Sequence, residues 1–418
     1  MPRTPPRTAV ARLAAMLFAV ATLLPFSAAA ATVKVEGRQI LVDGKPFTPR
    51  GVDGQQRLGL LPGLGANTVR TYGDETGYVL DEAQKHGLKV IAGFWLEQPR
   101  KGFDYKNLAQ VGPQLQKLQA FVERFRNHPA LLMWGIGNEV EAELADDSAV
   151  WPGIEDAAKL VRRLDPNHPT LAVLAETGKH KIARLMKLAP SIQVLGINSY
   201  GDALPSLPER VHEQGWRGPL LVTEMGPLGQ WAAPKTAWGA PIEPTSTEKA
   251  TLLSRYMTAL LPQTQGQFLF YWGQKQEVTP TWHSMLLQGG EWQQSAEVMA
   301  QAWGGKPPNG NRAPRILLLR FPQGNDWPRG DTRRAEISVD DPDGDPLGVV
   351  WSVMAESTDR KTGGDAEAVP QNFPQALRDP APKGVGIAGL EPGNYRLFVT
   401  VRDGKGAAAT GNLPFRIR

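Results

Sequence analysis

The chain has no cysteine among its 418 residues. This absence excludes disulfide scaffolds, thiol nucleophiles and cysteine-based zinc sites. The loop after the first predicted barrel strand, Gly51–Gln56, lacks the G-x-G-x-x-G spacing of a dinucleotide site, and neither a P-loop nor a Cys/His cluster occurs. We therefore expect no cofactor and no metal ion in the catalytic site.

A strong charge imbalance is also missing. The chain has 46 Lys and Arg residues against 42 Asp and Glu residues, a net charge of +4. Three arginines, Arg3, Arg7 and Arg12, lie near the N-terminus, and without them 43 basic residues face 42 acidic ones. We therefore expect no nucleic-acid partner, and no membrane partner beyond export.

Long apolar runs are scarce. The run from Leu13 to Phe26 is too short to span a bilayer comfortably. Positive residues precede it and small residues, Ser27–Ala31, follow it, which is the pattern of a secretory signal peptide. We predict that residues 1–31 are a signal peptide and that the mature protein is periplasmic or secreted. An uncleaved N-terminal anchor is the alternative.

Between residues 32 and 306, apolar runs of strand length alternate with amphipathic stretches of helix length. A hairpin around Gly37 precedes them. Eight strands are predicted, at Phe47–Val52, Ala66–Tyr72, Leu88–Trp95, Ala130–Ile136, Thr170–Ala175, Gln193–Asn198, Leu220–Thr223 and Gln267–Trp272. Their nearly continuous apolar character indicates burial on both faces. The α/β repeat predicts a (β/α)8 TIM barrel, with an open doubly wound sheet as the alternative.

A Gly- and Pro-rich linker, Gly304–Asn311, separates this region from a tail of short alternating runs. The tail resembles immunoglobulin-like and PKD-like modules in Asn311–Pro314, in Asp341–Asp345 before Trp351, and in Gly393–Leu397. We predict that residues 307–418 form a small, separately folded β-sandwich with Trp351 in its core. The acidic turn could bind Ca²⁺, but a solvated turn is the preferred interpretation.

In a barrel of this kind, chemistry takes place at the C-terminal ends of the strands. Two carboxylates, Glu139 and Glu224, each interrupt an apolar run at its exit, where burial is costly without a partner or a function. Two carboxylates in one cleft are what cleavage of a glycosidic bond requires. The alternative is a pair of strand-end salt bridges, for example between Glu224 and Arg70.

Four segments carry a family resemblance. Asn127–Glu139 resembles the acid/base segment of glycoside hydrolase family 2, Leu221–Gly226 its nucleophile segment, and Ile40–Asp53 its entry into the first barrel strand. Ala66–Tyr72 is also similar to β-1,3-glucanosyltransferases, which belong to the same clan of retaining (β/α)8 glycosidases.

The resemblance implies roles for individual residues. Glu139 would be the acid/base and Glu224 the nucleophile, with Asn138 on the sugar 2-hydroxyl. Arg70 would keep the nucleophile ionised, and Tyr200 would hydrogen-bond it. Aromatic platforms for sugar rings are predicted at strand ends and in late loops, with Trp272 as the floor of the sugar subsite: Trp95, Trp231, Trp238, Trp272 and Trp282.

These residues together predict an exported retaining glycoside hydrolase. Its substrate would be an oligo- or polysaccharide with β-linkages, a β-glucan in particular, cleaved by double displacement. One alternative is a transglycosylase with the same site, because the acceptor is chosen by subsites and water exclusion. The other is a non-catalytic carbohydrate-binding envelope protein.

Overall fold

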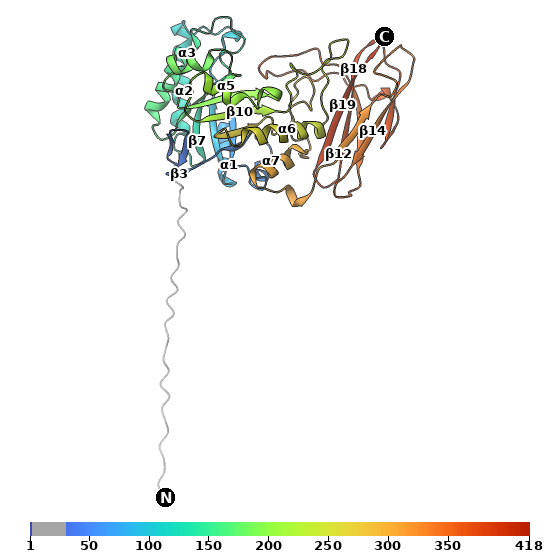
Figure 1. The fold of residues 1–418 in the computed structure, drawn as a ribbon, viewed down its shortest axis with the longest axis horizontal. Coiled ribbons are helices and arrows are strands. Elements are labelled where there is room, and N and C mark those ends of the chain that lie inside the picture. Colours follow the sequence, from blue (N-terminus) through green and yellow to red (C-terminus); the bar gives the residue numbers. More distant parts are fainter. Residues whose placement is uncertain (2–30) are drawn as a thin grey trace.

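Eight parallel strands close into a barrel in the computed structural model, which describes Met1 and residues 31–418 (Figure 1). The strands are β4 (Arg50–Asp53), β5 (Thr68–Tyr72), β6 (Lys89–Phe94), β7 (Leu131–Asn138), β8 (Thr170–Ala175), β9 (Val194–Tyr200), β10 (Leu220–Gly226) and β11 (Gly266–Leu269). They pair in sequence order, and β11 pairs with β4 to close the ring. The predicted TIM barrel is confirmed. The predicted signal peptide lies outside the described residues apart from Met1 and Ala31.

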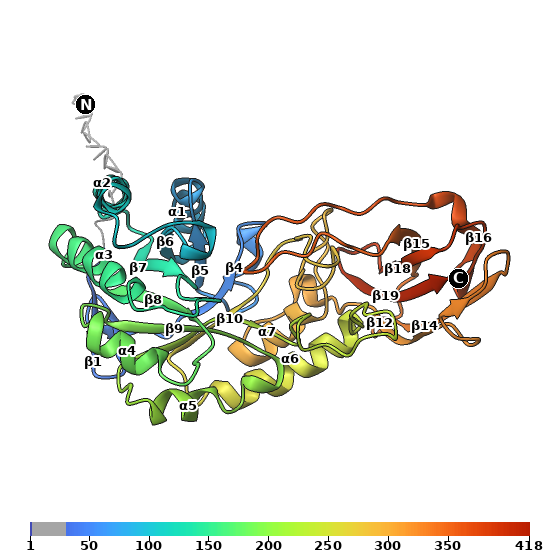
Figure 2. The same cartoon turned by 90° about the horizontal axis from the view of Figure 1, so that it is seen from above.

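Helices surround the barrel, as Figure 2 shows from above. They are α1 (Thr76–Lys85), α2 (Leu108–Phe125), α3 (Val150–Leu164), α4 (Lys181–Leu188), α5 (Leu207–Glu213), α6 (Ser246–Leu260) and α7 (Ser295–Trp303). The crossover between β4 and β5 contains only the short 3-10 turn Leu58–Leu60. Helix α3 buries Val150, Ile154 and Val161, whose spacing gives the helix one apolar face. Within residues 31–418 no helix is both long and apolar enough to cross a bilayer.

An N-terminal hairpin closes one end of the barrel. It consists of β1 (Val33–Glu36), β2 (Gln39–Val42) and the short β3 (Lys45–Pro46). Val33 and Ile40 of the hairpin share one apolar cluster with barrel residues, including Met133, Leu171 and Phe268. Access to the barrel is therefore left to the opposite end, where the strands terminate.

A second apolar core lies in the C-terminal part, which we call the C-terminal module (residues 307–418). Two four-stranded sheets form it, with orders β12-β14-β17-β16 and β13-β19-β18-β15. Their strands are β12 (Arg315–Arg320), β13 (Asp326–Trp327), β14 (Arg333–Asp340), β15 (Gly348–Ala355), β16 (Leu377–Ala381), β17 (Gly384–Ile387), β18 (Gly393–Arg402) and β19 (Ala408–Ile417). Trp351 is buried as predicted, in the same apolar core as Trp327, which stacks on Phe415 with ring centroids 5.0 Å apart. The immunoglobulin-like character of the sheets stays a prediction.

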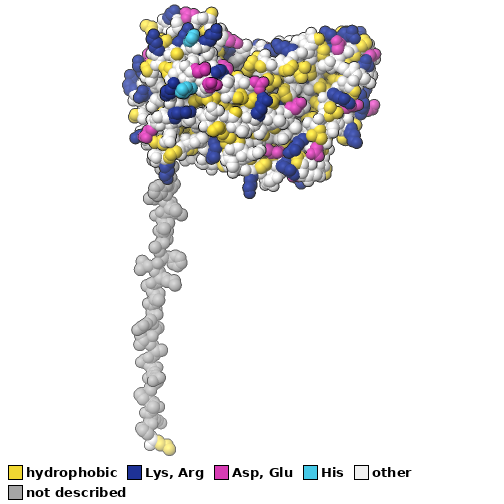
Figure 3. Space-filling model, in the orientation of Figure 1, with side chains coloured by type: hydrophobic (Ala, Val, Ile, Leu, Met, Phe, Trp, Pro, Cys, Tyr) yellow, Lys and Arg dark blue, Asp and Glu magenta, His cyan; other side chains and the backbone are white. Residues whose placement is uncertain are grey.

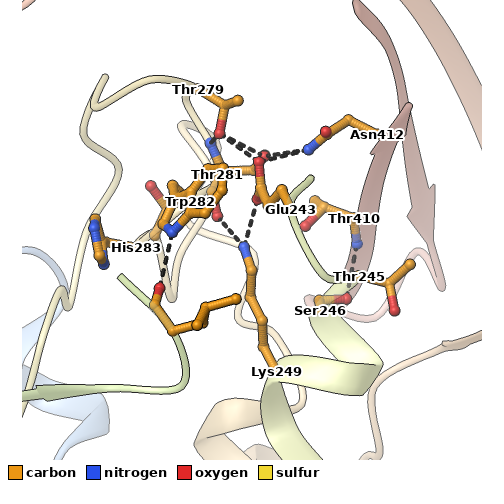
Figure 4. Close-up of polar contacts among 12 residues, drawn as sticks. Glu243, Thr245, Ser246, Lys249, Thr279, Thr281, Trp282, His283, Thr410 and Asn412 are labelled. Carbon is orange, nitrogen blue, oxygen red and sulfur yellow. Dashed lines mark hydrogen bonds and ion pairs between the residues drawn. The ribbon is translucent and has the colours of Figure 1, made fainter. Parts of the chain in front are cut away.

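The C-terminal module is joined to the barrel by buried polar contacts (Figure 4). Asn412 of β19 donates to Glu243 Oε2 at 2.6 Å, and Lys249 of α6 donates to the other oxygen at 2.5 Å. Thr279 also donates to Glu243 Oε2, at 2.6 Å. Burial works to raise the pKa of Glu243, but Lys249 and Thr279 hold that pKa below its usual range. Glu243 therefore takes hydrogen bonds from both parts of the chain, and the separate folding of residues 307–418 stays a prediction.

Charged side chains of both signs occur on both parts of the visible surface. Figure 3 shows Lys and Arg side chains interspersed with Asp and Glu over both the barrel and the C-terminal module. This distribution agrees with the small net charge of +4.

Replacing Asn412 tests the interface. The Asn412 amide donates to Glu243 and accepts from Arg396 Nη1 at 2.6 Å. Asn412→Ala leaves both charged groups short of a buried partner, so we expect it to lower the free energy of unfolding by about 3 kcal/mol. Chemical denaturation followed by tryptophan fluorescence measures this. The control is Asn394→Ala at an exposed position of β18. Equal stabilities of the two variants would contradict the prediction.

Candidate active site

A cavity of about 1110 Å³ lies at the C-terminal ends of the barrel strands. Its lining includes the last residues of five strands: Asp53, Tyr72, Asn138, Ala175 and Tyr200. Seven of the ten side chains that the sequence selected for the site line this one cavity: Arg70, Trp95, Asn138, Glu139, Tyr200, Glu224 and Trp231. The barrel therefore collects residues that are far apart in the chain into a single site.

Glu224 lies on β10 and accepts hydrogen bonds on both carboxylate oxygens. Arg70 donates to Oε1 from Nη2 at 3.1 Å and from Nη1 at 3.2 Å. The Tyr200 hydroxyl donates to Oε2 at 2.9 Å. Burial, and then the Glu224 charge, raise the pKa of Tyr200 well above its usual value, so its proton stays in this hydrogen bond. The salt bridge between Arg70 and Glu224, which the sequence offered as a purely structural alternative, is present, but it lies in the wall of the cavity.

Arg70 organises this side of the cavity. It donates to Asp53 Oδ1 at 2.7 Å, to Asn138 Oδ1 at 2.6 Å and to the Thr223 carbonyl at 2.6 Å. Burial works against its charge, but Asp53, Tyr72 and Glu224 raise the pKa of Arg70 above its usual range. The guanidinium therefore stays charged and bonds to three other barrel strands, β4, β7 and β10.

Glu139 has a different environment. Asn198 Nδ2 donates to Glu139 Oε1 at 2.8 Å and lies 3.2 Å from Asn138 Oδ1. Burial first, and the Glu224 charge second, raise the pKa of Glu139 to about 7. Its backbone has φ +49°, a left-handed conformation that a non-glycine residue adopts at some cost and that often marks a functional site. At neutral pH a large fraction of this carboxyl group therefore carries a proton.

Two exposed tryptophans line the cavity on different sides of the barrel. Trp95 follows β6, is 50% exposed and packs on Tyr72 with ring centroids 4.6 Å apart. Trp231 follows β10, is 61% exposed and meets Tyr200 edge-on at 5.3 Å. Strands β6 and β10 are four positions apart in the ring of eight and hence opposite each other. Flat aromatic faces on two walls suit the apolar C–H faces of sugar rings.

The prediction for Trp272 is wrong. Strand β11 ends at Leu269, and the backbone N–H of Trp272 donates a hydrogen bond to the Asp53 carbonyl at 2.7 Å. This places the Trp272 side chain in the barrel core, fully buried, with its indole N–H on the Gln56 carbonyl at 2.6 Å. Phe270 and Tyr271 line the cavity in its place.

Two of the loop tryptophans also lie elsewhere. Trp282 is buried, and its indole N–H donates to the Leu228 carbonyl at 2.9 Å. Trp238 lies under Arg416 of the C-terminal module, 5.1 Å from the guanidinium carbon to the ring centroid. Neither of these side chains lines the cavity.

Several residues that line the cavity were not among the predicted site residues. Asp53 and Asn198 are polar residues that directly follow apolar runs, which is the pattern that selected Glu139. The same pattern could therefore have selected them. The segment Lys361–Gly364 comes from the C-terminal module and also lines the cavity. No sequence signal marks this segment, because its only feature is a Gly-Gly pair in a polar loop.

Comparisons with known proteins agree with this geometry. Residues 65–204 match the model of "Glycosyl hydrolases family 2, TIM barrel domain". A β-glucuronidase of Chlorocebus aethiops is 30% identical over 192 residues, which are 40% of this chain and 27% of that protein. The chain thus matches only about a quarter of the length of that relative.

Solved structures share the fold. A β-glucuronidase from an uncultured Clostridium aligns with a TM-score of 0.54 at 19% identity, covering 66% of this chain and 53% of the other. Bacteroides uniformis β-glucuronidase 2 aligns with a TM-score of 0.53 at 12% identity, covering 93% and 48%. The barrel is thus similar to the catalytic barrels of family 2 glycosidases, as the Asn138-Glu139 segment indicated.

Proposed function

We propose that the protein is a retaining glycoside hydrolase in which Glu139 is the acid/base and Glu224 the nucleophile. The observation that carries this proposal is the contrast between two carboxylates in one cavity. Glu139 is held by one amide and has a pKa raised to about 7, whereas Glu224 receives donors on both oxygens. Carboxyl groups whose environments differ in this way can divide the acid and nucleophile roles.

In the first half of the reaction, the Glu139 carboxyl group gives its proton to the glycosidic oxygen. The Glu224 carboxylate attacks the anomeric carbon, the bond to the leaving group breaks, and a glycosyl ester forms on Glu224. In the second half, the Glu139 carboxylate takes a proton from water while the water oxygen displaces Glu224. Two inversions at one carbon return the original β-configuration and both side chains to their starting states.

The cations around the cavity support a neutral substrate. Among the described residues, every Lys or Arg that lines the cavity already contacts a carboxylate: Arg70 with Asp53, Arg100 with Asp365, Lys181 with Glu141, Lys275 with Glu277 and Lys361 with Asp359. A uronate carboxylate would have to compete for one of them. We therefore propose a neutral β-linked glycan, a β-glucan first, although the relatives are named β-glucuronidases.

A substrate panel tests the proposal. 4-Nitrophenyl β-glucoside, β-galactoside, β-mannoside and β-glucuronide are compared with β-glucan and β-mannan oligosaccharides, and products are separated by chromatography. We expect hydrolysis of a neutral β-glycoside. Preference for the glucuronide would contradict the proposal of a neutral substrate. Cleavage of none of these compounds would contradict the proposed glycosidase activity. Products longer than the substrate would identify the transglycosylase alternative, which uses the same site.

The pH dependence of the reaction follows from Glu139. The acid must be protonated to act, so kcat/KM falls above the pKa of about 7, by about tenfold per pH unit. The Asn198 hydrogen bond lowers this pKa. Asn198→Ala removes the bond, so the decline should begin at higher pH, and Glu139→Gln should remove the dependence on this group. A decline that stays in place in both variants would exclude Glu139 as the acid. The measurement is kcat/KM against pH on an aryl glycoside.

The cellular location is proposed on the sequence alone. The N-terminal pattern of residues 1–31 supports export to the periplasm or the medium, where polysaccharide substrates are found. Detection of the unprocessed N-terminus in a cytoplasmic fraction would contradict it.

A further inference from the structure

The loop between β15 and β16 leaves the C-terminal module and reaches the barrel. Figure 2 shows it running from the module toward β4. Four of its residues, Lys361–Gly364, line the cavity that holds Glu139 and Glu224. We propose that this loop, residues 357–368, forms a subsite for the sugar units beyond the one bound at the two carboxylates. The inference rests on the proposed glycosidase function.

The loop is fixed to the barrel at two places. Asp365 pairs with Lys101 at 2.6 Å and with Arg100 at 3.2 Å, both in the turn after β6. Glu367 Oε2 accepts from the Val278 backbone N–H, in the segment after β11, at 2.6 Å. The loop therefore spans from the third strand's exit to the eighth strand's exit.

The loop is also held by its own contacts. The Lys361 N–H donates to Glu367 Oε1 at 3.0 Å, and the Ala368 N–H donates to Asp359 Oδ2 at 2.9 Å. At its start, Glu356 is buried and accepts two hydrogen bonds from Arg396, at 2.7 and 2.9 Å. A wall with these supports can bind a ligand without a large ordering cost.

The chemistry of the wall suits neutral sugars. Thr362 offers a hydroxyl group, and Gly363 and Gly364 line the cavity without side chains of their own. Lys361 is paired with Asp359 at 2.7 Å and Arg100 with Asp365, so the wall has little net charge. Sugar hydroxyls bind to such mixed donors and acceptors. The cavity of about 1110 Å³ also exceeds the usual range of about 300–1,000 Å³ for drug-sized ligands.

The glycines of the wall have little room for a side chain. A Cβ on Gly363 would come within 2.7 Å of the Arg100 guanidinium, and one on Gly364 within 2.8 Å of Lys275 Nζ. Both glycines also have a positive φ, of +59° and +72°. The positive φ favours glycine at both positions, whereas the close contacts are with the flexible ends of Arg100 and Lys275, which can shift.

Two variants change the wall in different ways. Asp365→Ala removes the anchor to Arg100 and Lys101, and Thr362→Trp places a large side chain in the wall. Glu391→Ala is the matched control, because it removes an exposed ion pair with Arg329 in the same module. Thermal unfolding establishes that each full-length variant is folded.

The readout is the ratio of kcat/KM for cellotetraose or laminaritetraose to kcat/KM for 4-nitrophenyl β-glucoside. We expect about a tenfold fall of this ratio in Asp365→Ala and Thr362→Trp, the factor that corresponds to one lost hydrogen bond, and no change in the control. An unchanged ratio in both variants overturns the subsite and leaves the proposed function intact. Failure of the native protein to cleave any neutral glycoside overturns the proposed function, and the subsite with it.

Discussion

Glu224→Ala is expected to lower kcat on the order of 10⁴-fold or more, the scale seen when a catalytic nucleophile is removed. The covalent intermediate cannot form without the carboxylate. Tyr200 would lose the carboxylate to which it donates, and Arg70 would lose one of its acceptors. Steady-state hydrolysis of an activated aryl β-glycoside measures the loss.

Added azide distinguishes a missing nucleophile from a disrupted fold. The small anion can occupy the space of the deleted carboxylate and attack the anomeric carbon once. The product is then a glycosyl azide of inverted configuration, which NMR identifies. The matched control is Glu97→Ala, an exposed carboxylate in the loop after β6, which should keep its activity within a few-fold. Near-native activity of Glu224→Ala without azide would end the assignment.

Glu139→Ala is expected to act selectively. The proton donor matters most where the leaving group is a sugar, so hydrolysis of an oligosaccharide should fall by about 10²- to 10⁴-fold. A dinitrophenyl leaving group departs without a proton, so the first step on such a glycoside should survive. The glycosyl-enzyme would then accumulate, because no base remains to activate water.

Burst kinetics on the dinitrophenyl glycoside test this directly. We expect a rapid release of about one equivalent of dinitrophenol followed by a slow phase in Glu139→Ala, and azide should accelerate the slow phase. Equal losses on both kinds of leaving group, with no burst, would assign Glu139 a structural role beside Asn198.

Polar residues at the ends of the predicted strands identified much of the site, because a parallel barrel brings the C-terminal ends of its strands together. Asn138, Glu139 and Tyr200 end or follow their strands, Arg70 and Glu224 lie within theirs, and all five line one cavity. The residue types also carried information, since a carboxylate is rarely placed at such a position without a partner or a function. The same pattern would have found Asp53 and Asn198.

Trp272 shows where this reasoning fails. The apolar run continues past the point where the backbone leaves the sheet, so the pattern places the strand end at Trp272 whereas β11 ends at Leu269. This shift of three positions in the end of the strand places the Trp272 ring in the core and not in the cavity. Such boundaries depend on backbone contacts, here the bond from Trp272 to Asp53, that the local pattern does not contain.

The sequence could not predict, for a different reason, that the C-terminal module forms part of the cavity wall. A change from α/β alternation to short strands marks a new unit but not how that unit docks. The contacts of Asp365 with Arg100 and of Asn412 with Glu243 join residues far apart in the chain. These contacts make the module part of the cavity wall and of the barrel's buried polar network.

In the proposed mechanism Glu224 forms a covalent bond to the sugar, and trapping this intermediate is the direct test. The native protein is treated with the dinitrophenyl 2-deoxy-2-fluoro-β-glycoside of the sugar it cleaves, then digested, and the peptides are analysed by mass spectrometry. We expect one fluoroglycosyl group, on Glu224, with loss of activity in parallel. A label on another carboxylate, or an active protein that forms no adduct and releases sugar of inverted configuration, would contradict it.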